Sequence, residues 1–322
     1  MGNSCIKKNL ISPNKNSDIT FFKSENVIID WEAKNKTQKY HWWPMYEECE
    51  GDYVNNLYSK GGGLDKYDIL FDSHSTLYQK NNYYRKNGSN SKDAKWAGFC
   101  NNASILSCLY EYPKNDIYVY YNQREILFKK RDIEALMIIC SENAIKENIK
   151  LFFGDRNNSS YDDSNEPYPS EFLQMLDILC KHDEPFVMDI DKDSAVWNYA
   201  FDKVIVTKHT NCELREIELD GNTVYYNFKI TSNAYPDSNQ DLWGYINKSI
   251  KKGNEKEYEC IKEYECIKEG WITDYHPDFL WKNFKNDSMW EGMSKINPEI
   301  DASIVYKIYQ HSLTNSNIAL IC

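Results

Sequence analysis

The sequence WAGFCNNASILSCLY, residues 96–110, is the segment from which the rest of the chain is interpreted. The small residues Ala97 and Gly98 lead to Cys100, and an apolar run then reaches Tyr110. This order predicts a loop that delivers Cys100 to the first turn of a buried helix. A helix N-terminus has unpaired N–H groups and a partial positive charge, which favour a thiolate. Cys100 is therefore a candidate nucleophile, although a buried structural cysteine would fit the same stretch.

Length and charge limit the class of protein. The chain has 322 residues, of which 41% are hydrophobic, and this is enough to build a large core in one domain. Its net charge of −11 argues against nucleic-acid binding, which needs a basic surface. The same charge argues against electrostatic attachment to anionic lipid.

The ten cysteines are scattered, with no CxxC pair and no Cys/His cluster at zinc spacing. No calcium loop or nucleotide-binding glycine motif occurs either, so we expect no metal and no cofactor. The first thirty residues lack an apolar signal segment, and no apolar run approaches the roughly 20 residues that span a bilayer. These features predict a cytoplasmic protein with reduced thiols.

The chain opens with MGNSCIKK, which resembles an acylation signal. Gly2 is the candidate acceptor for N-myristoylation, and Cys5 is placed for a second acyl chain. Two chains would anchor a protein to a membrane, whereas one chain binds only marginally. Ile6 departs from the usual Ser or Thr at that position, so a plain flexible leader over residues 1–20 is the alternative.

Hydrophobic periodicity predicts helices in the first half and strands in the second. Asp132 is expected to cap a helix at residues 133–149, where apolar residues recur with helical spacing. The other expected helices cover residues 64–71 and 172–180, and the polar residues 79–95 are expected to form an exposed loop. The expected strands cover residues 21–33, 117–128 (a hairpin), 151–156, 185–190, 202–208, and 213–219 with 224–230 (a second hairpin). This pattern predicts an α+β fold, with residues 21–322 forming one domain.

Four blocks, WPMYEE…LDKYDILF, WAGFC, FVMDI…SAVWN and HPDFLW, follow one another in that order. In this order they resemble the transglutaminase-like family known from oomycete elicitors and from bacterial proteins, over about residues 42–285. The matching residues are Trp96, Gly98 and Cys100; Asp132, Ile133, Ala135 and Leu136; Gly154 and Arg156; Val196, Trp197 and Asn198; and His276 to Trp281. The resemblance implies a papain-like fold, with the nucleophile at a helix N-terminus packed on an antiparallel sheet. It also implies transfer of an acyl group from a protein glutamine to an amine through a cysteine thioester.

The resemblance assigns roles to particular residues. Cys100 would be the nucleophile, His276 the general base and Asp189 the group that orients the base. Further residues would line the substrate site, namely Trp96, Trp197 and Asn198. Each residue also has a structural interpretation: His276 can fix the turn before a proline, Asp189 can end a strand, and the tryptophans can pack in a core. His182 is the second candidate for the base.

Three departures leave the activity open. Asn101 follows Cys100 where the family has histidine, and Leu173 stands where a Phe-His pair is usual. Tyr199 and Ala200 replace the Gln-Pro that follows the VWN block. The chain is therefore either an active acyltransferase, or a deamidase or protease on the same scaffold, or an inactive pseudoenzyme kept as a membrane-tethered binding module. A histidine within about 4 Å of the Cys100 sulfur would favour the enzyme.

Overall fold

The computed structural model describes residues 25–45, 57–84, 97–142, 149–155, 167–190, 196–210, 223–235, 240–248, 267–273, 276–285, 287–314, 316 and 318–321. Gly2, Cys5, Trp96 and the expected strand 213–219 lie outside these ranges. Within the described ranges, none of the helices combines the length and the apolar character needed to cross a membrane.

The elements follow one another in a mixed order of helices and strands. In chain order they are β1 (Glu25–Glu32), α1 (Gly63–Phe71), α2 (Ser75–Tyr83), α3 (Cys100–Leu109), β2 (Ile117–Tyr121), β3 (Arg124–Phe128), α4 (Lys130–Cys140), β4 (Ile149–Gly154), α6 (Pro169–Leu179), β5 (Phe186–Asp189), β6 (Asn198–Phe201), β7 (Lys203–Thr210), β8 (Thr223–Thr231), β9 (Gln240–Lys248), β10 (Ile267–Trp271), β11 (Phe279–Asn283), η3 (Asp287–Trp290), α8 (Ala302–Ser312) and β12 (Ile318–Leu320).

The strands form three sheets. Their orders are β1-β7-β8-β9-β10, β4-β11-β5-β6 and β12-β2-β3. All neighbours pair antiparallel except β12 and β2, which are parallel. The expected α+β class with antiparallel sheets is therefore confirmed.

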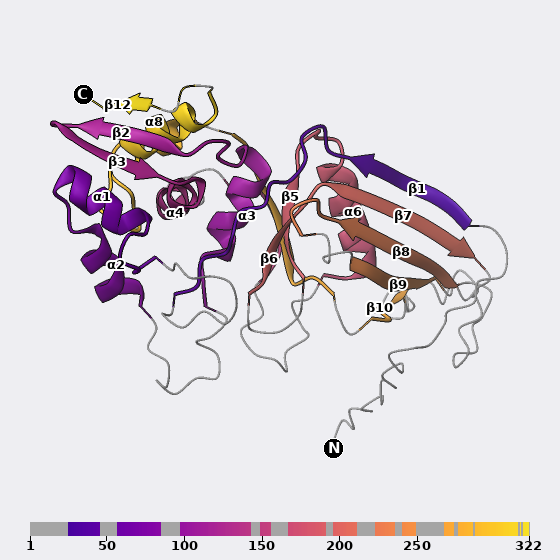
Figure 1. Cartoon of the computed structure of the whole chain (residues 1–322). Coiled ribbons are helices and arrows are strands. Elements are labelled where there is room, and N and C mark those ends of the chain that lie inside the picture. Colours follow the sequence, from indigo (N-terminus) through magenta and orange to yellow (C-terminus); the bar gives the residue numbers. More distant parts are fainter. Residues whose placement is uncertain are drawn as a thin grey trace, which may run out of the picture.

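Two hydrophobic cores share the four-stranded sheet. The first core gathers α1, α3, α4, α8, β2 and β12, and the second lies between α6 and the five-stranded sheet. Because neighbouring residues of a strand point to opposite faces, Val187 and Trp281 belong to the first core, and Met188 and Leu280 to the second. In Figure 1 the helical part and the five-stranded sheet lie at opposite ends, with α3, β5 and β6 between them.

Most helices and strands lie at the residues where the hydrophobic periodicity predicted them. The differences between the predicted and the observed bounds have physical reasons. Helix α4 ends at Cys140 rather than near residue 149, because Ile149 already belongs to β4. Asp132 closes the capping box from the third helical position instead of preceding the helix, and its Oδ2 accepts the Lys129 N–H at 2.8 Å. Residues 79–83, which form the second half of helix α2, were expected to belong to an exposed loop.

The polar face of α2 explains that last error. Gln79 is fully buried, and its Oε1 accepts a hydrogen bond from Asn297 Nδ2 at 3.0 Å. The same Asn297 amide donates to the Ser75 carbonyl at 2.9 Å. A polar helix is thus packed through hydrogen bonds to a distant segment, which single-sequence periodicity does not detect.

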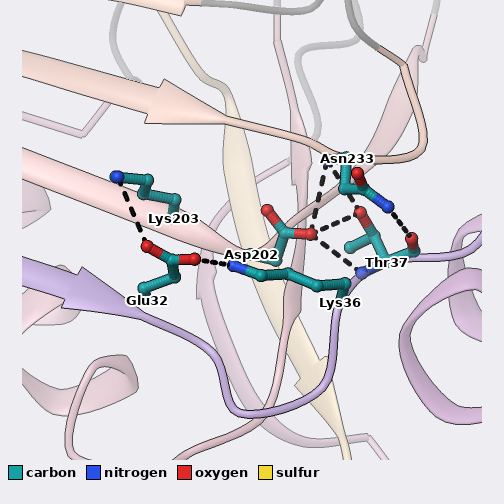
Figure 2. Close-up of polar contacts among 6 residues, drawn as sticks. All are labelled: Glu32, Lys36, Thr37, Asp202, Lys203 and Asn233. Carbon is teal, nitrogen blue, oxygen red and sulfur yellow. Dashed lines mark hydrogen bonds and ion pairs between the residues drawn. The ribbon is translucent and has the colours of Figure 1, made fainter.

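A buried polar cluster fixes the connector that leads from β1 into the first core. Asp202 Oδ2 accepts hydrogen bonds from Thr37 N at 2.8 Å, Thr37 Oγ1 at 2.8 Å and Asn233 N at 3.3 Å (Figure 2). Asn233 Nδ2 also donates to the Thr37 carbonyl at 3.0 Å. Beside this cluster, Glu32 forms ion pairs with Lys36 and Lys203 at the surface.

Candidate functional site

Cys100 is the first residue of α3. The helix places its apolar residues in the first core, where Ile105 and Leu106 are fully buried, while the Cys100 side chain is half-buried. Ser104 Oγ donates to the Asn198 carbonyl at 2.8 Å and so ties the second turn of α3 to β6. The Cys100 thiol therefore lies where the N-terminus of α3 meets strand β6.

Three polar groups surround the Cys100 sulfur. The thiol lies 3.6 Å from the Val196 carbonyl oxygen and 3.9 Å from Asn101 Oδ1, and it accepts a contact from Asn198 Nδ2 at 4.0 Å. All six histidines are in the described part of the chain, and none of them is hydrogen-bonded to this sulfur. An amide side chain, and not an imidazole, is therefore the group beside the thiol.

The sheet fixes Asn198 and Asp189 together. They face each other in the β5–β6 register, so their side chains lie on the same face of the sheet. Asp189 is fully buried, and its Oδ1 accepts the Trp197 backbone N–H at 2.8 Å. Asn198 Oδ1 accepts the Trp281 indole N–H at 2.9 Å, and Asn198 Nδ2 donates to Asn101 Oδ1. Hydrogen bonds to both its oxygen and its nitrogen therefore fix the orientation of the Asn198 amide.

The electrostatics of the site favour a protonated thiol. Burial raises the pKa of Cys100, and the nearby carboxylate of Asp189 raises it further. Hydrogen bonds from Asn198 lower the pKa; they are smaller than the effect of burial but larger than that of Asp189, and a hydrogen bond from the Asn101 backbone lowers it least. The thiolate expected from the helix N-terminus is therefore opposed by the surroundings of the sulfur.

The two histidines considered as the base lie against other residues. The His276 ring stacks on Trp271 with centroids 5.8 Å apart, and Trp271 packs against the second core. The His182 ring meets Phe284 edge-to-face at 5.4 Å. Leu173, which replaces the family's histidine, also packs against the second core. The structure brings Cys100, Asp189, Trp197 and Asn198 together, and neither His276 nor His182 is hydrogen-bonded to the sulfur.

Tryptophans flank the cysteine, and one of them was not expected from the sequence. The Trp42 ring meets the Trp197 ring edge-to-face at 6.2 Å. The Trp42 carbonyl accepts the N–H of Phe99, the residue before Cys100, at 2.6 Å. Trp42 also lies so close to Gly98 that a Cβ there would be 2.2 Å from its ring. Gly98, two residues before Cys100, was the one feature of the sequence that could have indicated a large side chain packed against this loop.

Gly98→Ala is expected to displace Trp42 and to lower the free energy of unfolding by about 1–3 kcal/mol, because the new methyl overpacks the indole. Chemical denaturation measures the loss, and alkylation of Cys100 should become faster. Gly61→Ala is the control, because its Cβ would meet no atom within 4 Å and only its backbone is unfavourable. Unchanged Cys100 alkylation in Gly98→Ala would show that Trp42 does not cover the site.

Within the described ranges, no group of three or more His, Cys, Asp or Glu side chains is arranged to hold a metal ion. No family model, curated protein or solved structure matches this chain.

Proposed function

We propose that this chain is a catalytically inactive counterpart of the transglutaminase-like cysteine acyltransferases, and that it binds an amide side chain such as glutamine at the Cys100 site. The observation that carries the proposal is the Asn198 amide, whose Nδ2 lies 4.0 Å from the sulfur. Thioester chemistry needs a base that takes the thiol proton. A carboxamide has no basic nitrogen and cannot do this.

The same amides give the site its binding chemistry. Asn198 Nδ2 is a donor and Asn101 Oδ1 is an acceptor, which are the two groups that hold a primary amide. In this structure Asn198 Nδ2 donates to Asn101 Oδ1, so a bound amide would take the place of that hydrogen bond. Trp42 and Trp197 lie half-buried beside them, and their rings would shield an inserted side chain from water.

An active acyltransferase is the second candidate. It is favoured by the position of Cys100 at the start of α3 and by the buried carboxylate of Asp189 opposite Asn198. In that case Asp189, and not a histidine, would have to take the proton from the thiol. Water in place of the amine would make the same site a deamidase or a protease.

Amine incorporation separates the two candidates. A fluorescent primary amine and casein, as a glutamine donor, are incubated with the wild-type protein and with Cys100→Ala. Equal labelling is expected, because no imidazole assists the thiol. Labelling by the wild type that exceeds labelling by Cys100→Ala would instead establish the enzyme.

Asn198→His is the matched gain-of-function variant, since it puts an imidazole between the sulfur and Asp189. A general base typically contributes about 10²–10⁴ in rate, so labelling at least tenfold above wild type is expected, and it should vanish in the double variant with Cys100→Ala. Binding is tested with a glutamine peptide and its glutamate counterpart. The glutamine peptide should bind more tightly, and Asn198→Leu should remove the difference.

A further inference from the structure

Trp281 reaches the candidate site from the middle of the four-stranded sheet. It lies on β11, opposite Phe152 of β4 on one side and Val187 of β5 on the other. Its side chain is 3% exposed and packs in the first core, which holds the indole in place. The indole N–H donates to Asn198 Oδ1 at 2.9 Å. This contact joins a buried core residue to the amide beside Cys100.

The indole determines which end of the Asn198 amide faces the sulfur. An indole N–H can donate but cannot accept, so the amide atom that meets it must be the oxygen. The nitrogen, Nδ2, therefore points the other way, toward Asn101 Oδ1 and toward the Cys100 sulfur, which is 4.0 Å away. Asn101 does not make this choice, because its side chain is exposed and its own amide can offer either an oxygen or a nitrogen.

With Asn198 held this way, the groups around the sulfur match a primary amide. Asn198 Nδ2 can donate to the carbonyl oxygen of a ligand. Two acceptors, the Val196 carbonyl and Asn101 Oδ1, lie 3.6 and 3.9 Å from the sulfur and can accept the N–H groups of the same ligand. A carboxylate has no N–H, so it would bring an oxygen against these acceptors and a negative charge toward the buried Asp189.

The opposite orientation of Asn198 would lose this match. If the Asn198 amide turned over, Asn101 would turn with it to keep the hydrogen bond between them. Asn101 would then offer a nitrogen, which a carboxylate can use as well as an amide can. The preference for an amide therefore depends on the group that holds the Asn198 oxygen.

We propose that Trp281 is a positioning residue that makes the Cys100 site select a primary carboxamide over a carboxylate, by holding the nitrogen of Asn198 toward the sulfur. The inference rests on the proposed function, in which a glutamine side chain binds at this site, and it adds the residue that sets the selectivity. The geometry that carries it is the chain of hydrogen bonds from Trp281 through Asn198 to Asn101.

Two replacements of Trp281 remove the donor and keep an aromatic ring. Trp281→Phe is the simple variant, and 3-benzothienylalanine at position 281 keeps the full bicyclic shape with sulfur in place of the N–H. Trp290→Phe is the matched control, because Trp290 is 2% exposed in the same core and its indole N–H bonds to none of the described residues. The control separates the effect of a smaller ring from the effect of the lost hydrogen bond.

Peptide binding measures the selectivity. The probes are acetyl-Gly-Gln-Gly methylamide, whose only primary amide is the glutamine side chain, and its glutamate counterpart. Isothermal titration calorimetry gives the dissociation constant of the glutamate peptide divided by that of the glutamine peptide. We expect both Trp281 variants to lower this ratio about three- to tenfold, the usual effect of one hydrogen bond, and Trp290→Phe to keep it. A ratio that is kept in the benzothienylalanine protein overturns the selectivity role.

The pH profile of Cys100 alkylation tests the orientation of Asn198 without any ligand. The reagent is N-ethylmaleimide, which has no primary amide, and the Cys100 peptide is followed by mass spectrometry. The hydrogen bond from the Asn198 side chain lowers the pKa of Cys100, whereas an oxygen facing the sulfur would favour the protonated thiol. Both Trp281 variants should therefore react with a profile moved to higher pH. Water that enters a loosened core would move the profile to lower pH, because it relieves the burial that raises this pKa.

The two measurements separate this inference from the proposed function. A profile of the benzothienylalanine protein that is unmoved, or moved to lower pH, overturns the orienting role of Trp281. If the wild type binds both peptides equally, the proposed function and the selectivity fail together, and the alkylation profile still decides whether Trp281 orients Asn198. If the wild type prefers glutamine and neither measurement changes in the Trp281 variants, only the role of Trp281 fails.

Discussion

Asp202→Ala is expected to lower the free energy of unfolding by about 2–4 kcal/mol, because it removes the acceptor of a buried polar cluster. The carboxylate is 2% exposed and accepts all three of its hydrogen bonds on Oδ2. Its removal leaves the backbone N–H of the fully buried Thr37 without this acceptor, while the Asn233 N–H keeps its hydrogen bond to Thr37 Oγ1 at 3.0 Å. A buried donor left without a partner costs about 1–3 kcal/mol. Denaturation by guanidinium or urea measures the loss directly.

Glu32→Gln is the matched control for Asp202→Ala, because Glu32 lies beside the same cluster (Figure 2). Its side chain is 49% exposed and its partners Lys36 and Lys203 are also at the surface. Exposed ion pairs contribute about 0–1 kcal/mol, so this variant should unfold almost like the wild type. If the two substitutions cost the same, the buried cluster does not hold the connector as described.

Glu134→Gln is expected to become more stable relative to the wild type as the pH rises, by up to about 3 kcal/mol between pH 4.5 and pH 7. The pKa of Glu134 is raised to about 7 by burial, from an ordinary value of 4.5. Stability from burying the neutral acid is therefore complete below pH 4.5 and is lost as the pH rises through about 7. Glutamine keeps an oxygen for the His41 backbone N–H, which donates to Glu134 Oε1, but does not ionise. Unfolding curves at several pH values measure the difference.

The comparison with the wild type isolates Glu134 from the neighbouring histidine. The His41 pKa is lowered to about 4, so its contribution to stability runs the other way and is lost as the pH falls from 6.5 through 4. His41 is present in both proteins, and its effect cancels in the difference. Glu111→Gln is the control, because its carboxylate is 58% exposed. Parallel pH profiles for Glu134→Gln and the wild type would contradict the burial of this charge.

The pattern of apolar residues within a short stretch was enough to predict some of the helices and strands. The alternation of residues 117–128 predicted the hairpin of β2 and β3, and the helical spacing after Asp132 predicted α4. The small residues before Cys100 predicted that this cysteine begins a helix. Each of these depends on neighbours within a few positions, so no knowledge of the tertiary fold was needed.

The surroundings of the thiol depend on pairing across the chain and were only partly predictable. The family resemblance pointed to Asp189 and Asn198, but only the β5–β6 register shows that they face each other. In the HPDFLW block the residue that reaches the site is Trp281, through Asn198, while His276 stacks on Trp271. Alternation along β11 and its pairing with β5 determine this choice, and neither can be read from the motif.

The first core is assembled from both ends of the chain, and this has a consequence for synthesis. Helix α4 packs against α8, whose residues emerge from the ribosome more than 150 positions later. Until then the face of α4 that packs against α8 lacks its partner, although α1, α3 and β3 already contact α4, and the β-rich half is made in between. The first core is therefore completed only after α8 is synthesised, and a chain that stops before α8 would expose an apolar face of α4 and be prone to aggregate.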